Sequence, residues 1–286
     1  MKKRLFYPKG ITGALVAIFE EYVDEWIART ALHFRWNNEE GTKHGKEMIG
    51  RDLLDSKERK SLSLEQLKEK GIAIGEFVQT WGKRACMAVG VATPLQQRKC
   101  EEELERILTN FEKHLQQGSR FLLGYRPSAF DAVLFGGFEA HFFFDPAPKK
   151  RFFNKGKYPK FIETYEWNLS QGKTGSLNSQ VTGKTHQLVD VRDLPQFFKF
   201  FLEEISEGPF SSYLDMTKKN YNQKSFEMEC YGEKLSFKTR KYVADSLREL
   251  NKFISNHLSS QDALKFNTLM KQYKLDHVFS ANASRI

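Results

Sequence analysis

The chain has 286 residues and a net charge of +9, from 45 basic and 36 acidic residues. Hydrophobic residues make up 40% of it, which is enough for a sizeable core and argues against global disorder. Mean hydropathy is −0.57, and no apolar run approaches the roughly 20 residues of a membrane-spanning helix. The three widely spaced cysteines favour a reducing compartment over a disulfide framework. We therefore expect a soluble, cytoplasmic protein with no transmembrane segment.

The first elements in chain order are helices separated by a polar stretch. Apolar residues at helical spacing predict a first helix from about Thr12 to near Leu32. Residues 37–70 are rich in charge and glycine, so we expect a long connection there with a short helix over 64–69. A second helix is predicted over 74–91, with Phe77, Trp81 and Met87 among its apolar residues.

Helical patterns dominate the rest of the chain. A third helix is predicted over 94–117: Thr93 can cap its N-terminus, Pro94 suits the first helical position, and Gly118 ends it. Ser, Thr, Gly, Gln and Asn dominate 169–193, which predicts a polar linker. Further helices are predicted at 127–140, 159–168, 194–207, 209–220, 240–257 and 261–273, and a small hairpin at 225–238. The fold class is therefore all-α with one possible β-hairpin.

Motifs that would carry chemistry are missing from the sequence. None of the seven histidines lies in an H-x-x-x-H spacing, and there is no C-x-x-C pair, so we expect no metal site. No G-x-S-x-G nucleophile elbow is present either. These observations predict no catalytic residue in the chain and no required cofactor.

A basic segment between His141 and Lys160 allows two interpretations. It contains Lys149, Lys150 and Arg151, interleaved with aromatic residues. One interpretation is a nucleic-acid or membrane-surface module with stacking aromatics. The other is a loop whose aromatic rings face the core and whose lysines face water. We favour the second, because so many exposed rings would be costly, and nucleic acid is therefore an unlikely partner.

A helix start is encoded around Ser128. Ser128 is well placed as an N-cap, and Asp131, three residues later, can reach back to the backbone N–H of the cap. The charge of Asp131 also suits the positive end of the helix. This pair predicts a structural N-capping box that ties down an apolar, buried helix.

The segment FLLGYRPSAFD, residues 121–131, closely resembles the start of the central buried helix in glutathione transferase C-terminal domains. The segments EEYVDEW, residues 20–26, and HFFFDPAP, residues 141–148, resemble a bacterial-type branch of that family. The resemblance covers roughly residues 9–168. It implies a glutathione-transferase C-terminal-like helical domain at 1–168, the linker at 169–193, and a helical extension at 194–286 that packs on the same core.

The resemblance also carries expectations about binding. In the family, the first helix of this domain lines the hydrophobic substrate site, which implies ligand-binding roles for Tyr22, Trp26 and His33. Glutathione and the catalytic residue belong to a thioredoxin-like domain that precedes that helix. Here the helix is expected to begin within about a dozen residues of Met1, so we expect glutathione only with a thioredoxin-like partner domain. A homodimer is also usual in the family.

Three functions remain open from the sequence. The first is a non-catalytic helical domain that binds a small apolar ligand or a protein partner. The second is a glutathione transferase whose thioredoxin-like half is on another chain or is lost from the gene model. The third is the basic surface module built on Lys149, Lys150 and Arg151.

Overall fold

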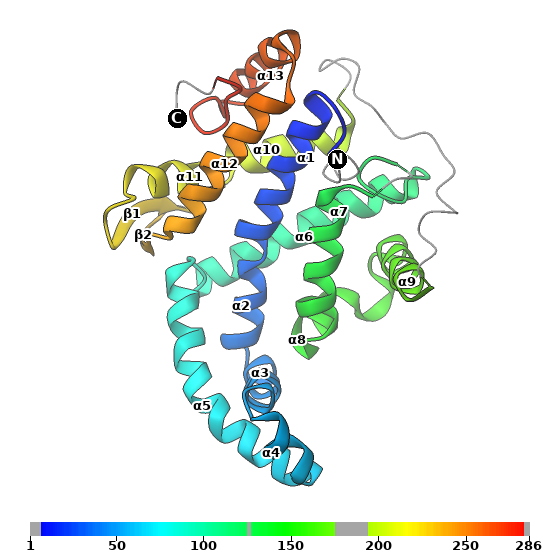
Figure 1. Ribbon diagram of the computed structural model, residues 1–286, viewed down its shortest axis with the longest axis vertical. Coiled ribbons are helices and arrows are strands. Elements are labelled where there is room, and N and C mark those ends of the chain that lie inside the picture. The colour runs from blue at the N-terminus through cyan, green and yellow to red at the C-terminus, as the bar shows by residue number, and fades with distance from the viewer. Residues whose placement is uncertain (1–6, 125–126, 175–193, 283–286) are drawn as a thin grey trace. The chain divides into compact units, whose positions relative to one another are not determined.

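The computed structural model describes residues 7–124, 127–174 and 194–282 (Figure 1). These residues are mostly helical, and their one sheet is the antiparallel pair β1 (Ser225–Cys230) and β2 (Glu233–Lys238). The predicted all-α class with a small hairpin is therefore confirmed at this level. None of the helices in the described ranges is long and apolar enough to cross a membrane.

The helices have the following bounds. The N-terminal ones are α1 (Ile11–Tyr22), the π-helical turn η2 (Val23–Ile27), α2 (Arg29–Trp36), α3 (Glu39–Asp52), α4 (Ser56–Ser61), α5 (Leu64–Ala88) and α6 (Pro94–Gln116). The middle ones are α7 (Ala129–Gly137), the π-helical turn η3 (Phe138–Phe143), α8 (Pro146–Pro148), the π-helical turn η4 (Lys149–Phe153), the 3-10 turn η5 (Asn154–Gly156) and α9 (Pro159–Thr174). The last ones are α10 (Gln196–Glu207), α11 (Phe210–Lys219), α12 (Lys241–His257) and α13 (Ser260–Gln272).

The chain forms two compact units, each built from separate stretches of sequence. The first unit comprises residues 1–26, 106–136 and 158–286, and the second comprises residues 27–105 and 137–157. The predicted domain boundaries at 168 and 194 stay predictions. Helix α9 continues to Thr174 rather than ending near residue 168, and residues 175–193 of the predicted linker lie outside the described residues.

An aromatic core fills the first unit. Phe19 of α1 is fully buried and stacks on Phe201 of α10 with ring centroids 5.0 Å apart. Phe201 also meets Phe130 of α7 edge-on at 5.2 Å. Helix α12 lies beside α1 (Figure 1). Burying a ring of this kind contributes roughly 1.5–3 kcal/mol to the free energy of unfolding. The apolar face of α1 therefore anchors this helix in the core.

The hairpin packs on the first unit through alternate residues. On β1 the buried positions alternate strictly with exposed ones, as expected for a strand with one wet face. Phe226 and Phe237 form a cross-strand pair, and both rings contact Tyr213 of α11. Tyr231 and Gly232 both have positive φ, 57° and 81°, which is the two-residue turn that such hairpins favour. The predicted hairpin at 225–238 is thus confirmed.

Helices α3 and α5 of the second unit lie side by side (Figure 1) and touch through glycine. A Cβ on Gly50 would lie 1.8 Å from the carbonyl oxygen of Gly71, and one on Gly75 would lie 2.4 Å from the carbonyl oxygen of Lys46. Only glycine permits so close a backbone approach. The expectation of a mainly non-helical connection over 37–70 is therefore wrong, because the buried faces of these helices carry glycine in place of an apolar stripe.

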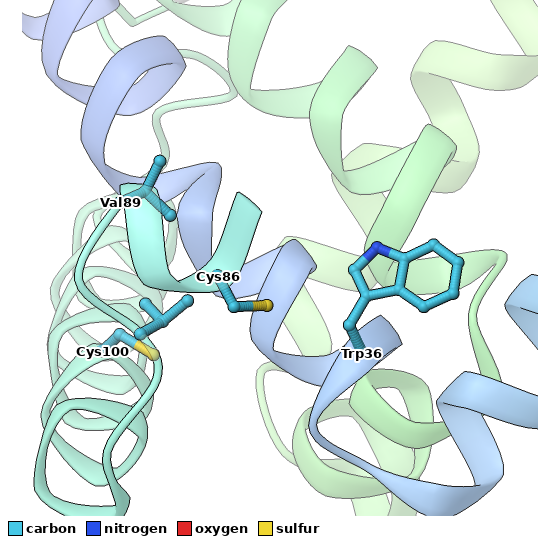
Figure 2. Close-up of a cluster of buried hydrophobic side chains, with 5 residues drawn as sticks. Trp36, Cys86, Val89 and Cys100 are labelled. Atoms are coloured by element: carbon cyan, nitrogen blue, oxygen red, sulfur yellow. The ribbon is translucent and has the colours of Figure 1, made fainter. Parts of the chain in front are cut away.

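A small hydrophobic cluster lies at the C-terminal end of α5 in the second unit. Figure 2 shows Cys86 and Val89 at the end of α5, Cys100 on α6 and Trp36 on α2. Trp36 packs against Gly82 so closely that a Cβ there would lie 2.4 Å from the indole ring. Burial raises the pKa of the Cys86 thiol to about 11 and that of the Cys100 thiol to about 12. Both cysteines are therefore core residues in thiol form.

Helix starts follow the sequence signals closely. Thr93 Oγ1 accepts from the backbone N–H of Gln96 at 3.3 Å, and Gln96 Oε1 accepts from the backbone N–H of Thr93 at 2.9 Å. This reciprocal pair is a capping box and confirms the predicted start of α6.

The helix predicted from about Thr12 to near Leu32 is not continuous. It is interrupted by η2, a π-helical turn that inserts an extra residue into the helical hydrogen-bond ladder.

Candidate functional site

Tyr22 and Trp26 lie together in the aromatic core of the first unit. Each is 1% exposed. The ring of Tyr22 is 5.1 Å from that of Phe210, and the indole of Trp26 is 5.3 Å from the ring of Tyr213. Side chains of α11 therefore occupy the space beside both residues. Their ligand-binding role stays a prediction, and the packing seen here is that of core residues.

His33 belongs to the second unit. Its Nε2 atom lies 2.9 Å from Glu101 Oε1, and its Nδ1 atom is buried with no hydrogen-bond partner within the described ranges. The ring is 4.8 Å from that of Phe34, its neighbour on α2. His33 is thus a buried, paired side chain of its own unit, while the other two predicted ligand-binding residues are packed in the first unit.

Two cations of the basic segment, Arg151 and Lys157, pair with carboxylates of α6. Arg151 donates to Glu101 Oε2 at 3.1 Å and to Glu105 Oε2 at 3.4 Å, and Lys157 donates to Glu105 Oε1 at 2.8 Å. These cations lower the pKa of the Glu105 carboxyl. Lys149 and Lys150 are exposed.

The aromatic residues of the same segment are mostly buried. Phe142, Phe152 and Phe153 are buried, while Phe144 is 51% exposed. The rings lie inward and the lysines outward, as in the favoured interpretation. The expectation of a loop is wrong, because the segment is formed by the short helical turns η3, α8, η4 and η5. This arrangement offers little support for a surface of stacking aromatics.

A buried polar contact that the sequence analysis missed joins α2 to the start of α8. Asp145 is 1% exposed and accepts two hydrogen bonds from Arg35, from Nε and from Nη2, each at 2.9 Å. His141 Nδ1 lies 3.2 Å from Arg35 Nη2, and burial lowers the pKa of this histidine. Asp145 precedes Pro146, a common helix-start pattern that marks the local turn and gives no information about Arg35.

Acidic side chains gather where α1 meets α12 in the first unit. Glu20 pairs with the Tyr7 hydroxyl, Glu21 Oε2 accepts from Ser246 Oγ at 2.9 Å, and Glu25 lies 3.3 Å from Arg240. Burial raises the pKa of all three carboxyls, that of Glu21 to about 7. In the sequence, Glu20 lies one turn from Asp24 and Glu21 one turn from Glu25, a spacing that allows acid/base pairs but is more typical of a solvated helix face. In the structure Glu20, Glu21 and Glu25 are half-buried instead, because charge alternation on a helix does not reveal which charges become buried.

Replacing Glu21 with glutamine is expected to flatten the pH dependence of stability. Since the folded state raises the pKa of Glu21 from 4.5 to about 7, the protonated side chain stabilises the fold at low pH. This contribution is lost as the pH rises through about 7. Thermal unfolding midpoints between about pH 5 and about pH 8 should therefore fall more in the wild type than in Glu21→Gln. The control is Glu249→Gln, at an exposed position, whose midpoints should depend on pH as those of the wild type do. If the midpoints of Glu21→Gln fall with pH as steeply as those of the wild type, the prediction is wrong.

At the start of α7, Asp131 reaches back to the backbone N–H of Ser128 as predicted, which is one half of a capping box. Asp131 Oδ2 accepts from the Ser128 backbone N–H at 2.7 Å and from Ser128 Oγ at 2.6 Å. Asp131 Oδ1 also accepts from the Leu122 backbone N–H at 2.8 Å. Burial raises the pKa of Asp131 to about 6, and the donated hydrogen bonds oppose that rise. The box therefore fastens both α7 and the preceding turn; Tyr125 and Arg126 lie outside the described residues.

The outer side of α5 is the most unusual surface of the second unit. Phe77 is 73% exposed and Trp81, one turn later, is 56% exposed; Met87 is 55% exposed. Large apolar side chains left open on one helix in this way mark interaction sites. The two aromatic rings exposed one turn apart make this face the strongest candidate for a functional surface. Among the described residues, no group of three or more His, Cys, Asp or Glu side chains could hold a metal ion.

Comparison with known proteins does not assign the chain to a family. No protein-family model matches it, and neither a curated protein nor a solved structure matches it. The functional conclusion therefore depends on the residues and their geometry.

Proposed function

We propose that this chain is a glutathione-transferase-like helical domain that works by binding a protein partner, and that the outer face of α5 is the binding surface. The observation that carries this proposal is the exposure of Phe77 and Trp81, which are one turn apart on a helix whose opposite side packs against α3 through buried glycines. Aromatic residues of this kind are the usual anchors of protein interfaces.

Two further observations support this proposal over the alternatives. The packing of Tyr22 and Trp26 against Phe210 and Tyr213 leaves little room for a small apolar ligand beside them. The pairing of Arg151 with α6 carboxylates weakens the case for a nucleic-acid surface. The glutathione-transferase-like part of the proposal is supported by the capping box of Ser128 and Asp131, the most specific segment of the resemblance.

The proposal is tested by placing a photo-crosslinking phenylalanine analogue at position 77 of the full chain in living cells. We expect a discrete protein adduct on illumination, because the ring at this position should lie inside the interface. The matched control carries the analogue at Leu264 of α13, which is 72% exposed and lies in the first unit. A Trp81→Ser substitution should abolish the adduct from position 77.

Two results would count against the proposal. If positions 77 and 264 give the same adducts, or if position 77 gives none, α5 is not a specific binding surface. If the chain itself conjugates glutathione to a chromogenic electrophile, the domain is catalytic and the binding proposal does not describe its main activity.

A further inference from the structure

The exposed face of α5 has the spacing of a helix-pairing seam. Residues at alternating intervals of three and four along it are all exposed: Lys70, Ala73, Phe77, Thr80, Arg84 and Met87. Such spacing keeps one line of side chains facing a second helix over several turns. Trp81 borders the line on one side, and the glycines that touch α3 lie on the opposite side of the helix.

The charges beside this seam change sign along the helix. Glu69, Glu76 and Lys83 follow each other at intervals of seven residues, so they lie on one flank. After Glu76 the helix carries Lys83 and Arg84 and no acidic residue. In the described part of the chain, Glu69 and Arg84 form no ion pair. On this flank two carboxylates therefore precede one ammonium group, and Glu76 is shared with Lys46 of α3, whose Nζ lies 2.7 Å away.

We propose, on the basis of the protein-binding function above, that the partner of α5 is a second copy of this chain, paired antiparallel about a twofold axis. A twofold axis that crosses α5 midway between Gln79 and Thr80 is at equal distance along the helix from Glu76 and from Lys83. It therefore places Glu76 of each copy opposite Lys83 of the other copy. The interface then contains this Glu–Lys contact twice, as an isologous interface requires. A parallel pair would instead place like charges together.

This interface differs from the dimer that the family resemblance implies, because it needs no residue outside the helical domain. Burying the rings of Phe77 and Trp81 from both copies removes at most about 600–1,000 Å² of aromatic surface from water. These rings alone supply less than the roughly 1,200 Å² of total surface that stable interfaces bury, so the polar residues of the seam must supply the rest. We therefore expect a pair that depends on concentration.

Sedimentation velocity of the full chain across a roughly hundredfold range of micromolar concentrations tests the pairing. We expect a monomer–dimer equilibrium in the wild type. Glu76→Lys and Lys83→Glu should each weaken the dimer by about tenfold or more, because two attractive contacts become repulsive. A mixture of these two variants should form the heterodimer with near wild-type affinity, because its charges are again complementary.

Matched controls keep the result interpretable. Glu69→Lys makes the same charge change as Glu76→Lys but one heptad further from the axis, and it should leave the affinity of the dimer nearly unchanged. Glu76 also pairs with Lys46 within the chain at 2.7 Å, so thermal unfolding checks that Glu76→Lys still folds. Phe77→Ser removes an anchor without changing charge and should also yield monomers.

The same experiments separate failure of the pairing from failure of the proposed function. A wild type that stays monomeric, or variants that do not recover affinity when mixed, would overturn self-association. An adduct from position 77 with a different protein would then leave the binding function intact. Absence of any specific adduct from that position would contradict both.

Trp81 offers an independent optical readout. Of the four tryptophans in the chain, Trp26 and Trp36 are 1% exposed, whereas Trp81 is 56% exposed. Dimer formation should therefore shift the emission to shorter wavelength and reduce quenching by iodide as the concentration rises. Emission that does not change over the range in which dimer forms would place the interface elsewhere on the molecule.

Discussion

Replacing Glu103 with alanine is expected to lower the free energy of unfolding by about 3–5 kcal/mol. Glu103 Oε2 lies 2.6 Å from Arg29 Nη2, and the two side chains are 3% and 1% exposed. Arg29 also donates to the Gly90 carbonyl at 3.1 Å. Removing the carboxylate takes away the counter-charge that lies 2.6 Å from a buried guanidinium, which is far costlier than losing an exposed pair. Urea unfolding followed by circular dichroism measures the loss.

Two comparisons show whether burial causes that loss. The double variant Arg29→Met with Glu103→Leu should recover most of it, because an apolar pair of similar volume often replaces a buried ion pair at little cost. Lys70→Ala breaks an exposed pair with Glu58, whose side chains are 50% and 40% exposed, and should cost less than about 1 kcal/mol. If Glu103→Ala costs no more than Lys70→Ala, the buried pair is not a major contributor.

Replacing Asp131 with alanine is expected to lower the free energy of unfolding by about 3 kcal/mol or more. This one side chain accepts hydrogen bonds from two backbone N–H groups and one hydroxyl, all of them buried. Leaving a buried donor unsatisfied costs about 1–3 kcal/mol for each group, and some relaxation of the turn reduces the sum. The effect should appear as a lower unfolding midpoint in urea.

Graded substitutions at the same box provide the controls. Ser128→Ala keeps both backbone contacts of Asp131 and should cost about 1 kcal/mol, as is usual for a capping side chain. Asp131→Asn keeps the shape of the side chain but directs an amide towards N–H donors. Its loss in free energy of unfolding should therefore lie between those of Ser128→Ala and Asp131→Ala. Equal losses for Ser128→Ala and Asp131→Ala would mean that the contact with Leu122 contributes nothing.

The sequence predicted best those elements whose signals are local. The start of α6 follows from Thr93 and Pro94, the hairpin follows from alternation around Tyr231–Gly232, and the box follows from Ser128 and Asp131. Each needs only residues a few positions apart. The fold class follows because these local signals repeat along most of the chain.

The interior of α3 and α5 could not be predicted in this way. Helix prediction relies on an apolar stripe, but the buried stripe here is made of glycines such as Gly50 and Gly71. Glycine otherwise weakens helices, so residues 37–70 gave the pattern of a connection. Asn38 and Ser63 do cap α3 and α5, and these caps were the signal that could have revealed them.

The candidate surface was missed for a related reason. Phe77 and Trp81 lie on an apolar stripe, and a stripe of that kind normally faces the core. Periodicity alone does not say which of two stripes on one helix is buried. The apolar face that carries Tyr22 and Trp26 was predicted correctly from helical spacing, but only the structure shows that side chains of α11 fill the space beside them.

The glycine contact between α3 and α5 also has a consequence for how this protein can change as its lineage diverges. Every larger residue at Gly50 or Gly75 must push two backbones apart, so nearly all substitutions there should be removed by selection. The outer side of α5 has no such steric limit. Descendants of this chain should therefore keep the inner glycines while positions 77 and 81 remain open to adapt to whatever they bind.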